Sequence, residues 1–405
     1  MNLKFNPYVP SGIAFPGMFI GRIDEIHAIE QALFQTKHSN PQHIIISGER
    51  GIGKSSLLYV ADLIARGELD SGNPDFNFLT VSTDLAGIHS QGGIIKQIGR
   101  ELRSKLRMHE KLQEKAKKGW EFLSRWEILG VKYNGKEDSI DPDQALDDLV
   151  ALLVFLVESK SFDGVSVFLD EADVPPVEAN LGEFVKILTE RLAKQGCSQV
   201  CILLAGQAEL VPTLRASHES SLRIFQFLNI GPLEEKERSE VVRHGIKTAN
   251  EKNVIQTSVT DEAVQKISEL SEGYPHFLQQ FSYCAFDVDS DNTIDEDDVI
   301  NGAYAENGGL AQLGSKYFNE MYFSKIWSEE YRKVLNFMAT HGVSWVSRKQ
   351  IVSGCEVKPT NIDNALSVLK EREIIVGNKI QRGLYRLPTN SFAAWILAIG
   401  QDKLL

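Results

Sequence analysis

A run of small, cationic and hydroxyl residues near the N-terminus has the spacing of a phosphate-binding loop. The run reads Gly48-Glu49-Arg50-Gly51-Ile52-Gly53-Lys54-Ser55, with Ser56 after it. Its glycines let backbone N–H groups converge on phosphate oxygens at the positive end of a helix. Lys54 can reach the β- and γ-phosphates, and Ser55 can bind Mg²⁺. The pattern predicts a site for a nucleoside triphosphate, most simply ATP, with Mg²⁺; the alternative is a Gly-rich turn with a surface lysine.

A pair of carboxylates, Asp170 and Glu171, follows the buried apolar run 165–169. The carboxyl end of a central strand lies beside the phosphate loop in an open α/β sheet. We therefore expect Asp170 to hold the Mg²⁺ shell and Glu171 to polarise an attacking water as a general base. The alternative is a helix N-cap followed by a first-turn acid. Asp173 has no clear role in this pattern and is expected to be a cap or turn residue.

Gln207 is a further candidate, because it follows the apolar run 200–206. A polar side chain at that strand end could orient the attacking water or contact the γ-phosphate. Alternatively, it could simply face solvent.

Strands and helices alternate around these residues. We expect strands at residues 43–47, 76–81, 165–169, 200–206 and 224–230, and helices at 24–35, 55–64, 92–106, 143–159 and 177–194. This alternation predicts an α/β fold in which a parallel sheet has helices on both faces. The phosphate loop then joins a strand to a helix, which is the context that makes its motif credible.

Beyond residue 233 the strands stop, and we expect further domains. The predicted domains are an α/β domain over residues 1–233, a small all-helical lid domain over 234–320 and a winged helix over 327–405. The winged helix is predicted from three helical stretches followed by a hairpin. An insertion at about 107–139 mixes Lys and Glu with Trp120 and Trp126. These tryptophans could contact nucleic acid or pack an extra hairpin onto the body.

The C-terminal part is the basic part of an acidic chain. From residue 327 onward there are 11 Lys and Arg against 7 Asp and Glu, whereas all 405 residues together carry a net charge of −12. This distribution argues against a protein that coats nucleic acid and favours a local contact. The candidates for double-stranded DNA are the start of the third helix and the wing: Lys358, Thr360, Asn361, Asn364, Lys379, Arg382 and Arg386. The alternative is a winged helix that contacts a protein.

Composition argues against a membrane protein and an exported one. The 42% hydrophobic and 24% charged content is ordinary for a soluble globular protein, and no apolar stretch could span a bilayer. The start lacks an apolar leader core. The four cysteines have neither CxxC nor metal spacing and are expected to be reduced. We therefore expect a cytoplasmic protein without membrane contact.

An acidic stretch at residues 287–298 has most of the carboxylate positions of an EF-hand loop. However, Asn292 stands where that loop needs glycine, and Asp298 stands where it needs a bidentate glutamate. We interpret the stretch as an acidic loop between helices that contains a helix N-cap.

Residues 19–25, Phe-Ile-Gly-Arg-Ile-Asp-Glu, add a further motif. With it, the chain resembles the AAA+/STAND class of P-loop ATPases, and more narrowly the origin-recognition-initiator-like ATPases of bacteria and archaea with a C-terminal winged helix. The segment looks like the hhGRxxE box of that family, which implies that Gly21 and Arg22 lie against the adenine. The alternative is a helix N-terminus with two acids that suit its dipole.

The resemblance implies roles for two more positions. Arg223 matches the position of an arginine finger, which would act in trans on ATP held by a neighbouring subunit, with Arg215 as a weaker competitor. It could instead be a surface arginine or part of a salt bridge. Gly273-Tyr274-Pro275 looks like the GxP motif of STAND proteins, which implies that Pro275 lies near the nucleotide. Initiators usually carry an arginine in this region, so the departure implies a slow switch.

Two functions remain open from the sequence. In the first, the chain is a slow ATP hydrolase that switches or assembles with nucleotide, self-associates through the ATP interface and contacts DNA. In the second, it is a STAND-type signalling or defence switch. Its winged helix would then bind a partner effector protein or hold the protein inactive.

Overall fold

The chain folds into two compact units in the computed structural model, which describes residues 4–13, 18–69, 75–107, 141–378 and 380–399. One unit, here called the sheet unit, is Arg22–Gly231. The other, the helical unit, consists of Met1–Gly21 and Pro232–Leu405. The expected insertion at about 107–139, with Trp120 and Trp126, lies almost wholly outside the described residues.

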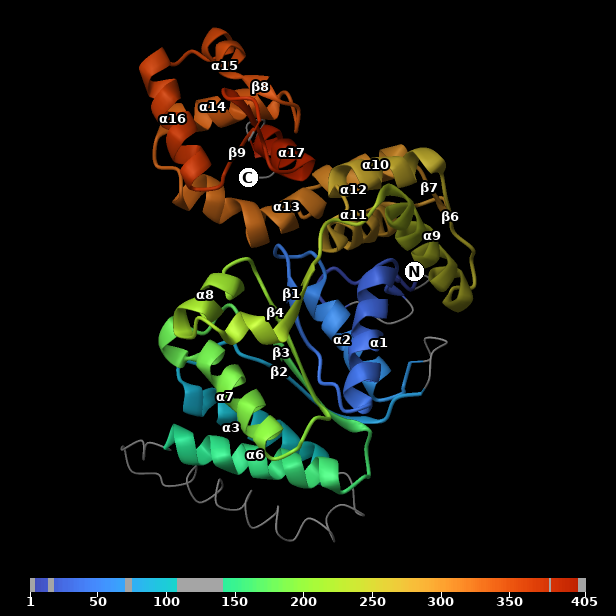
Figure 1. Ribbon diagram of the computed structural model, residues 1–405. Coiled ribbons are helices and arrows are strands. Elements are labelled where there is room, and N and C mark those ends of the chain that lie inside the picture. Colours follow the sequence, from blue (N-terminus) through green and yellow to red (C-terminus); the bar gives the residue numbers. More distant parts are fainter. Residues whose placement is uncertain (1–3, 14–17, 70–74, 108–140, 379, 400–405) are drawn as a thin grey trace, which may run out of the picture. The chain divides into compact units, whose positions relative to one another are not determined.

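The sheet unit contains a five-stranded parallel sheet in the order β2-β3-β4-β1-β5 (Figure 1). Its strands are β1 (His43–Ser47), β2 (Phe78–Asp84), β3 (Gly164–Asp170), β4 (Val200–Gly206) and β5 (Phe225–Asn229). Its helices are α1 (Ile23–Lys37), α2 (Lys54–Ala65), α3 (Gln91–Arg107), α6 (Pro142–Glu158), α7 (Leu181–Lys194) and α8 (Leu210–Ser217), with 3-10 turns η2 (Val177–Ala179) and η3 (Ser221–Ile224). This confirms the α/β fold class expected from the alternating pattern.

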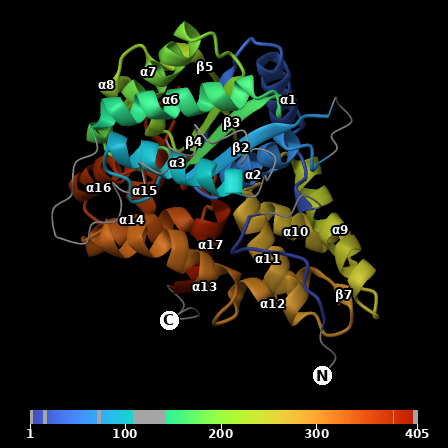
Figure 2. The ribbon, with the colours of Figure 1, turned by 90° about the horizontal axis from the view of Figure 1, so that it is seen from below.

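Helices cover both faces of this sheet. The helices α3, α6 and α7 pack on one face, where Ile45, Val167 and Leu204 join their apolar side chains in one core. There α3 and α6 lie side by side (Figure 2). The helices α1 and α2 pack against each other and against the strands on the opposite face. Strand β1 is buried along its whole length, as expected of a central strand covered on both sides.

The stretch 177–194, expected to be one helix, is divided in the structure. The 3-10 turn η2 ends at Ala179. The next residue, Asn180, has a left-handed φ of 54°, and α7 begins after it at Leu181. Asparagine tolerates this conformation better than most residues. The apolar spacing therefore predicted the helix correctly and missed the break before it.

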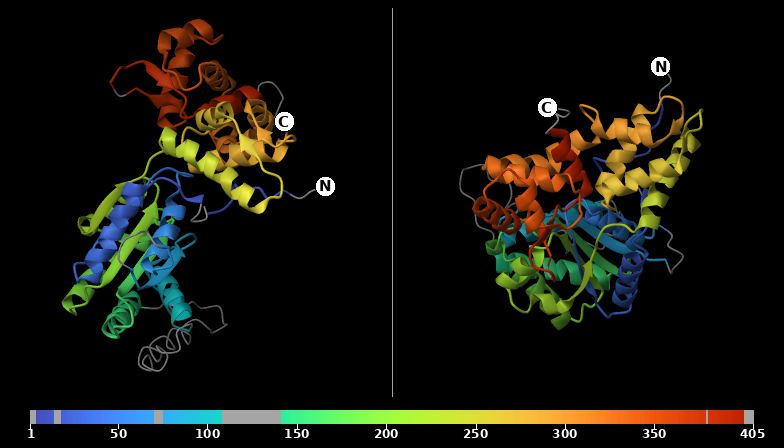
Figure 3. Two further views of the ribbon diagram at one scale, coloured as in Figure 1. Left: turned by 90° about the vertical axis from the view of Figure 1, so that its right-hand side faces the viewer. Right: turned by 90° about the horizontal axis from the view of Figure 1, so that it is seen from above.

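The helical unit holds the remaining elements, which can be followed in yellow to red in Figure 3. Its first part comprises α9 (Glu235–Lys252), β6 (Ser258–Val259), α10 (Asp261–Ser271), α11 (Pro275–Val288), β7 (Thr293–Ile294), α12 (Glu296–Tyr304) and α13 (Gly309–Leu313). Two π-helical turns follow, η4 (Gly314–Phe318) and η5 (Glu320–Ser324). We expected only helices here; the short parallel pair β6 and β7 is a correction.

The C-terminal part of the helical unit is built from four helices and a small sheet. These are α14 (Glu329–Ala339), β8 (Val346–Ser347), α15 (Arg348–Gly354), α16 (Pro359–Glu371), β9 (Val376–Gly377), β10 (Leu384–Arg386) and α17 (Asn390–Ile399). The strands form an antiparallel sheet in the order β8-β10-β9. The three expected helices and the expected hairpin are present, whereas β8 and α17 were not predicted.

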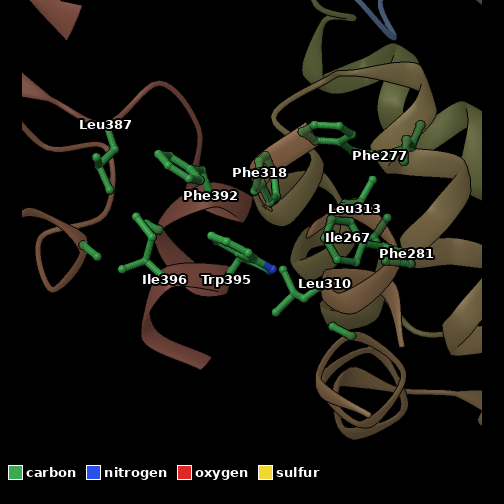
Figure 4. Close-up of a cluster of buried hydrophobic side chains, with 14 of the residues drawn as sticks. Ile267, Phe277, Phe281, Leu310, Leu313, Phe318, Leu387, Phe392, Trp395 and Ile396 are labelled. Atoms are coloured by element: carbon green, nitrogen blue, oxygen red, sulfur yellow. The ribbon is translucent and has the colours of Figure 1, made fainter. Parts of the chain in front are cut away.

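An aromatic cluster joins α17 to the segment before α14. The ring centroids of Phe318 lie 5.2 Å from Phe392 and 5.6 Å from Trp395 (Figure 4). Gly314 allows this approach, because a Cβ there would lie 2.1 Å from the indole Nε1 of Trp395. The expected lid and winged-helix domains are therefore packed into one unit.

The N-terminal segment belongs to the helical unit, not to the α/β domain where we had placed it. Tyr8 is buried, and its hydroxyl donates a 2.7 Å hydrogen bond to the carbonyl of Val242 in α9. Gly245 makes room for the ring, since a Cβ there would lie 2.3 Å from it. The Lys4 ammonium lies 2.6 Å from the Asp289 carboxylate. These contacts correct the expected domain boundary at residue 1.

None of the helices in the described ranges combines the length and the apolar composition needed to cross a bilayer.

Candidate functional site

The predicted phosphate loop joins the buried strand β1 to α2. Gly51 and Gly53 have φ values of 80° and 99°, which other residues adopt only with strain. At Gly48 a Cβ would lie 2.8 Å from the carbonyl oxygen of Ile230. Ile52 is buried and holds the loop to the body. The three glycines are thus required by backbone conformation or by close packing, and the loop ends at the N-terminus of α2, the positive end of its dipole.

Lys54 is folded onto the loop that it follows. Its ammonium donates hydrogen bonds to the carbonyl oxygens of Gly48 and Glu49, each at 2.9 Å. Burial lowers the pKa of Lys54, and nearby carboxylates, Asp173 first and Asp170 next, act in the opposite direction. Burial therefore outweighs the charges of the neighbouring carboxylates at this lysine. Ser55 and Ser56 follow it in the first turn of α2.

The carboxylates expected at the end of β3 are in place. Asp170 is the last residue of the strand, and its Oδ1 accepts a 2.9 Å hydrogen bond from the backbone N–H of Glu171. Glu171 has a left-handed φ of 49°. Burial, followed by the charges of Asp170, Asp84 and Asp173, raises the pKa of Glu171. A carboxylate with a raised pKa holds a proton more strongly and is a better base when ionised.

Asp84 is an acidic residue that the sequence analysis did not single out. It ends β2, and the register of the sheet pairs it with Asp170 at the end of β3. Its Oδ1 accepts a 3.2 Å hydrogen bond from the N–H of Ala86. Asp84 could have been found in the sequence as an acidic residue that follows an apolar strand, which is the pattern that identified Asp170. The pairing could not be predicted, because it depends on which strands are neighbours.

Asp173 lies in the turn after β3, as expected, and its carboxylate approaches two residues at the end of β4. Its carboxylate lies over Gly206, where a Cβ would be only 2.7 Å from Oδ1. Its Oδ2 accepts a 3.2 Å hydrogen bond from Nε2 of Gln207. Gln207 is therefore bonded to a carboxylate in the turn that follows the neighbouring strand, and its expected contact with the attacking water or the γ-phosphate stays a prediction. The sequence indicated this residue only by its position, as a third acid three residues after Asp170.

Arg22 is buried, and its guanidinium is directed at backbone carbonyls. Nη2 donates to the carbonyl oxygen of Ile52 at 3.2 Å and to that of Gly231. Nη1 lies 3.4 Å from the carboxylate of Glu25. Gly21, with a φ of 79°, packs closely against Glu237 in the helical unit. The expected contact of Gly21 and Arg22 with adenine remains a prediction.

The two candidate arginine fingers are both exposed on the sheet unit. Arg223 lies in the 3-10 turn η3 directly before β5, and its backbone N–H donates to the carbonyl of Ser220 at 3.2 Å. Arg215 lies in the last turn of α8. The exposure of Arg223 permits a contact with a second molecule and does not establish one.

Pro275 opens α11 in the helical unit. Gly273, before it, has a φ of 83°, and its carbonyl accepts a 2.8 Å hydrogen bond from the N–H of Leu233. Tyr274 stacks on Phe277 with the ring centroids 5.2 Å apart. His276 lies edge-on to Tyr317 at 5.4 Å. These contacts place His276 in an aromatic cluster at the start of the helix.

The candidate DNA-binding residues are not equally available. Lys358, Thr360, Asn364 and Arg382 are exposed. The Asn361 side chain donates a 2.9 Å hydrogen bond to the Glu330 carboxylate. The Arg386 guanidinium lies over the Trp345 ring at 5.4 Å. The expected DNA contact of Asn361 and Arg386 stays a prediction. Lys379 lies outside the described residues.

The acidic stretch at 287–298 uses its carboxylates within the protein. Asp289 pairs with Lys4 and also accepts a 2.8 Å hydrogen bond from the N–H of Asn292. Asp295 caps α12 and forms a capping box with Asp298. This is the N-cap arrangement by which we interpreted the stretch.

The comparisons with known proteins agree with this geometry. The NACHT domain family matches residues 42–249, half of the chain, and the chain belongs to this family. It thus carries a P-loop NTPase domain of the AAA+/STAND type, as the motifs implied. No curated protein matches the chain.

Solved structures share its fold at low sequence identity. The Walker-type ATPase PABY2304 of Pyrococcus abyssi is 17% identical, with a TM-score of 0.51 over 94% of this chain and 96% of that one. The ORC2 protein of Aeropyrum pernix, in ADPNP–ADP complexes, is 15% identical, with a TM-score of 0.56 over 95% of each chain. In its ADP form it is 14% identical, with a TM-score of 0.55 over 98% of this chain and 97% of that one.

Proposed function

We propose that this chain binds ATP with Mg²⁺, hydrolyses it slowly and uses the nucleotide to switch or assemble. The observation that carries the proposal is the strand order. The phosphate loop after β1 and the acids Asp170, Glu171 and Asp173 at the end of β3 lie at the same edge of one parallel sheet, with β4 between the two strands, and these acids act on the charge of Lys54. A lone phosphate loop explains only phosphate binding. An adjacent carboxylate with a raised pKa supplies the base that hydrolysis needs.

The residues at this edge fit Mg²⁺ chemically. A serine hydroxyl at Ser55 and a carboxylate at Asp170 are the hard oxygen donors that this ion prefers. When bound, the ion would offset the negative charge of the β- and γ-phosphates. Lys54 would exchange its two backbone acceptors for phosphate oxygens, because hydrogen bonds between charged groups are the stronger ones. The backbone N–H groups of the loop would bind the remaining oxygens.

Glu171 would accept the proton of the attacking water. Its position beyond β3 and its raised pKa support this role. Gln207, fixed by Asp173, is suited to orient that water or to contact the γ-phosphate. Slow turnover is consistent with a GxP turn at Pro275 in place of the arginine that initiators usually carry in this region.

Nucleotide binding by the full chain tests the proposal. Wild type is expected to bind ATP with Mg²⁺ in a titration calorimeter and to release phosphate, whereas Lys54→Ala should lose both. The control is Lys186→Ala, which removes an exposed ion pair with Glu190 on α7 and should leave both unchanged. Failure of wild type to bind ATP or any other nucleoside triphosphate would refute the proposal.

We further propose that the C-terminal part, residues 327–405, is a winged helix that contacts double-stranded DNA. The order α14-β8-α15-α16-β9-β10 supports the winged-helix assignment, and the exposed Lys358, Thr360 and Arg382 support the contact. Duplex affinity should fall steeply between two salt concentrations if phosphate contacts carry it. Absent or salt-insensitive binding, with and without ATP, would refute the DNA contact.

A specific observation favours the second candidate, a signalling or defence switch. The Asn361 amide is hydrogen-bonded to the Glu330 carboxylate, and the Arg386 guanidinium lies over the Trp345 ring, so both groups already have partners within the protein. The winged helix would then contact a partner effector protein or hold the chain inactive. The same titration separates the two functions, because only the DNA-associated ATPase predicts duplex binding.

A further inference from the structure

Two peptide bonds, here called the passages, connect the two units, and Arg22 takes part in or contacts both of them. One passage is the bond from Gly21 to Arg22, and the other is the bond from Gly231 to Pro232. Gly21 and Arg22 both have left-handed φ values, 79° and 61°. Two such residues in succession turn the chain sharply, and for arginine this conformation is uncommon. The sequence therefore tolerates strain at this point.

The Arg22 side chain connects the second passage to the phosphate loop. Its Nη2 donates both to the Ile52 carbonyl in the loop and to the Gly231 carbonyl at the end of the sheet unit. Arg22 and Gly231 are 209 positions apart in the sequence. A guanidinium is planar and holds its donors in a fixed fork. Movement of one acceptor therefore changes the geometry at the other.

A second set of contacts continues from this passage inside the helical unit. Two residues after Gly231, the N–H of Leu233 donates to the Gly273 carbonyl at 2.8 Å. A Cβ at Gly273 would lie only 2.4 Å from the Leu233 carbonyl oxygen, so the two backbone segments are in direct contact and leave no room for a side chain. Next to Gly273, the Glu272 carboxylate accepts the N–H of Asn390, the first residue of α17.

We propose that Arg22 is a positioning residue that transmits the state of the phosphate loop to the passage at Gly231 and onward to the Gly273 turn and α17. Phosphate draws the N–H groups of the loop toward itself, which reorients the peptide units and carbonyls between them. The Ile52 carbonyl belongs to these peptide units. Its reorientation pulls on Arg22, and Arg22 moves the Gly231 carbonyl. The inference rests on the proposed function only in requiring that a nucleotide bind the loop.

Hydrogen exchange of the full chain, with and without ATP and Mg²⁺, tests this transmission. In wild type, nucleotide should slow exchange in the loop and also at Leu233, Tyr274 and the start of α17. Arg22→Lys keeps the charge and removes the fork. Because Arg22 is also expected near the adenine, each protein is measured at a nucleotide concentration that saturates it. Under that condition the loop of Arg22→Lys should be protected, and the response at Leu233, Tyr274 and α17 should be lost.

The matched control is Arg191→Lys. Arg191 is another forked arginine of the sheet unit, with Nη1 2.7 Å from Asp147 and Nη2 3.0 Å from Asp143, and both of these partners belong to α6. Its variant should respond as wild type does. A full response at Leu233 and Tyr274 in Arg22→Lys would overturn the proposal.

The remaining outcomes are also decisive. A wild type that binds nucleotide without any change in exchange at Leu233, Tyr274 and α17 overturns the inference and leaves nucleotide binding intact. A wild type that binds no nucleotide refutes the proposed function instead. Glu272→Ala breaks the path at its far end and keeps Arg22, so it tests the path if Arg22→Lys does not fold. It should retain the response at Leu233 and lose it at α17; retention at both sites overturns the proposal.

Discussion

The side-chain amide of Gln207 donates a hydrogen bond to the carboxylate of Asp173, with 3.2 Å between the two atoms. This bond joins the segments that follow β4 and β3, which are neighbours in the sheet. Strand β4 also adjoins β1, which leads into the phosphate loop. Burial lowers the pKa of Lys54, and the charge of Asp173 is the largest of the carboxylate charges that act against this lowering. We therefore expect Asp173 to act together with the predicted catalytic pair, Asp170 and Glu171.

Asp173→Asn should slow hydrolysis more than it weakens binding. The variant removes the anion that holds Gln207 and stabilises the Lys54 charge, and preorganised electrostatics of this kind are worth about tenfold or more in turnover. We expect phosphate release to fall by that factor, whereas ATP affinity measured by calorimetry changes little. Asp148→Asn, on α6, is the control and should match wild type. Unchanged turnover in Asp173→Asn would show that the residue serves only the turn.

Glu171→Gln should abolish most hydrolysis and retain nucleotide. The amide cannot accept the proton of the attacking water, and general bases typically contribute about 10²–10⁴ in rate. Single-turnover phosphate release on preformed complexes measures the loss without interference from binding. If turnover persists at the wild-type rate while ATP still binds, Glu171 is not the base.

Asp84→Asn should move the pH profile of hydrolysis. Glu171 must be ionised to act, so the rate falls as pH falls through its pKa, which burial and its acidic neighbours raise above the ordinary value of 4.5. Removal of the Asp84 charge lowers that pKa, and the acid limb of the profile shifts to lower pH. Asp148→Asn should leave the limb in place. A limb that does not move in Asp84→Asn would exclude this coupling.

Arg223→Ala tests whether a second subunit completes the site. If Arg223 acts in trans, Arg223→Ala subunits retain an intact phosphate loop and Lys54→Ala subunits retain an intact arginine. Each variant alone should be inactive, and a mixture should recover part of the phosphate release. A mixture of Arg215→Ala subunits with Lys54→Ala subunits shows which of the two arginines acts on the neighbouring ATP. No recovery in any mixture would argue against an arginine finger.

Tyr8→Phe should destabilise the helical unit modestly. The change removes the hydroxyl that bonds to the Val242 carbonyl, and the loss of one such bond typically costs about 0.5–1.5 kcal/mol. The free energy of unfolding in urea measures it. Tyr59→Phe, at a side chain that is 38% exposed, is the control and should be neutral. Equal stability of the two variants would mean that the N-terminal segment is not held by Tyr8.

Much of the fold was predictable because its signals are local. The apolar composition predicted the five strands to within a few residues, and for β1 both the first and the last residue were predicted correctly. The glycines at 51 and 53 identified the loop, since positive φ requires them. The break at Asn180, strand β8 and helix α17 were missed, because short elements have little periodicity and depend on what they pack against.

The candidate site was predictable in part for the same reason. Asp170 and Glu171 follow an apolar strand, so their place at the sheet edge followed from chain order. Asp84 and Asp173 carried the same residue chemistry. Their roles depended on strand order, register and the close approach at Gly206, none of which a local pattern contains.

The sequence by itself determined the phosphate loop, the strand-end acids and the alternating α/β plan, because each is specified by residues a few positions apart. The tertiary structure alone decided that Arg22 reaches Gly231 across 209 positions and that the N-terminal segment joins the helical unit. Such contacts result from the packing of distant segments, in which buried carbonyls and apolar faces must find partners wherever the chain brings them.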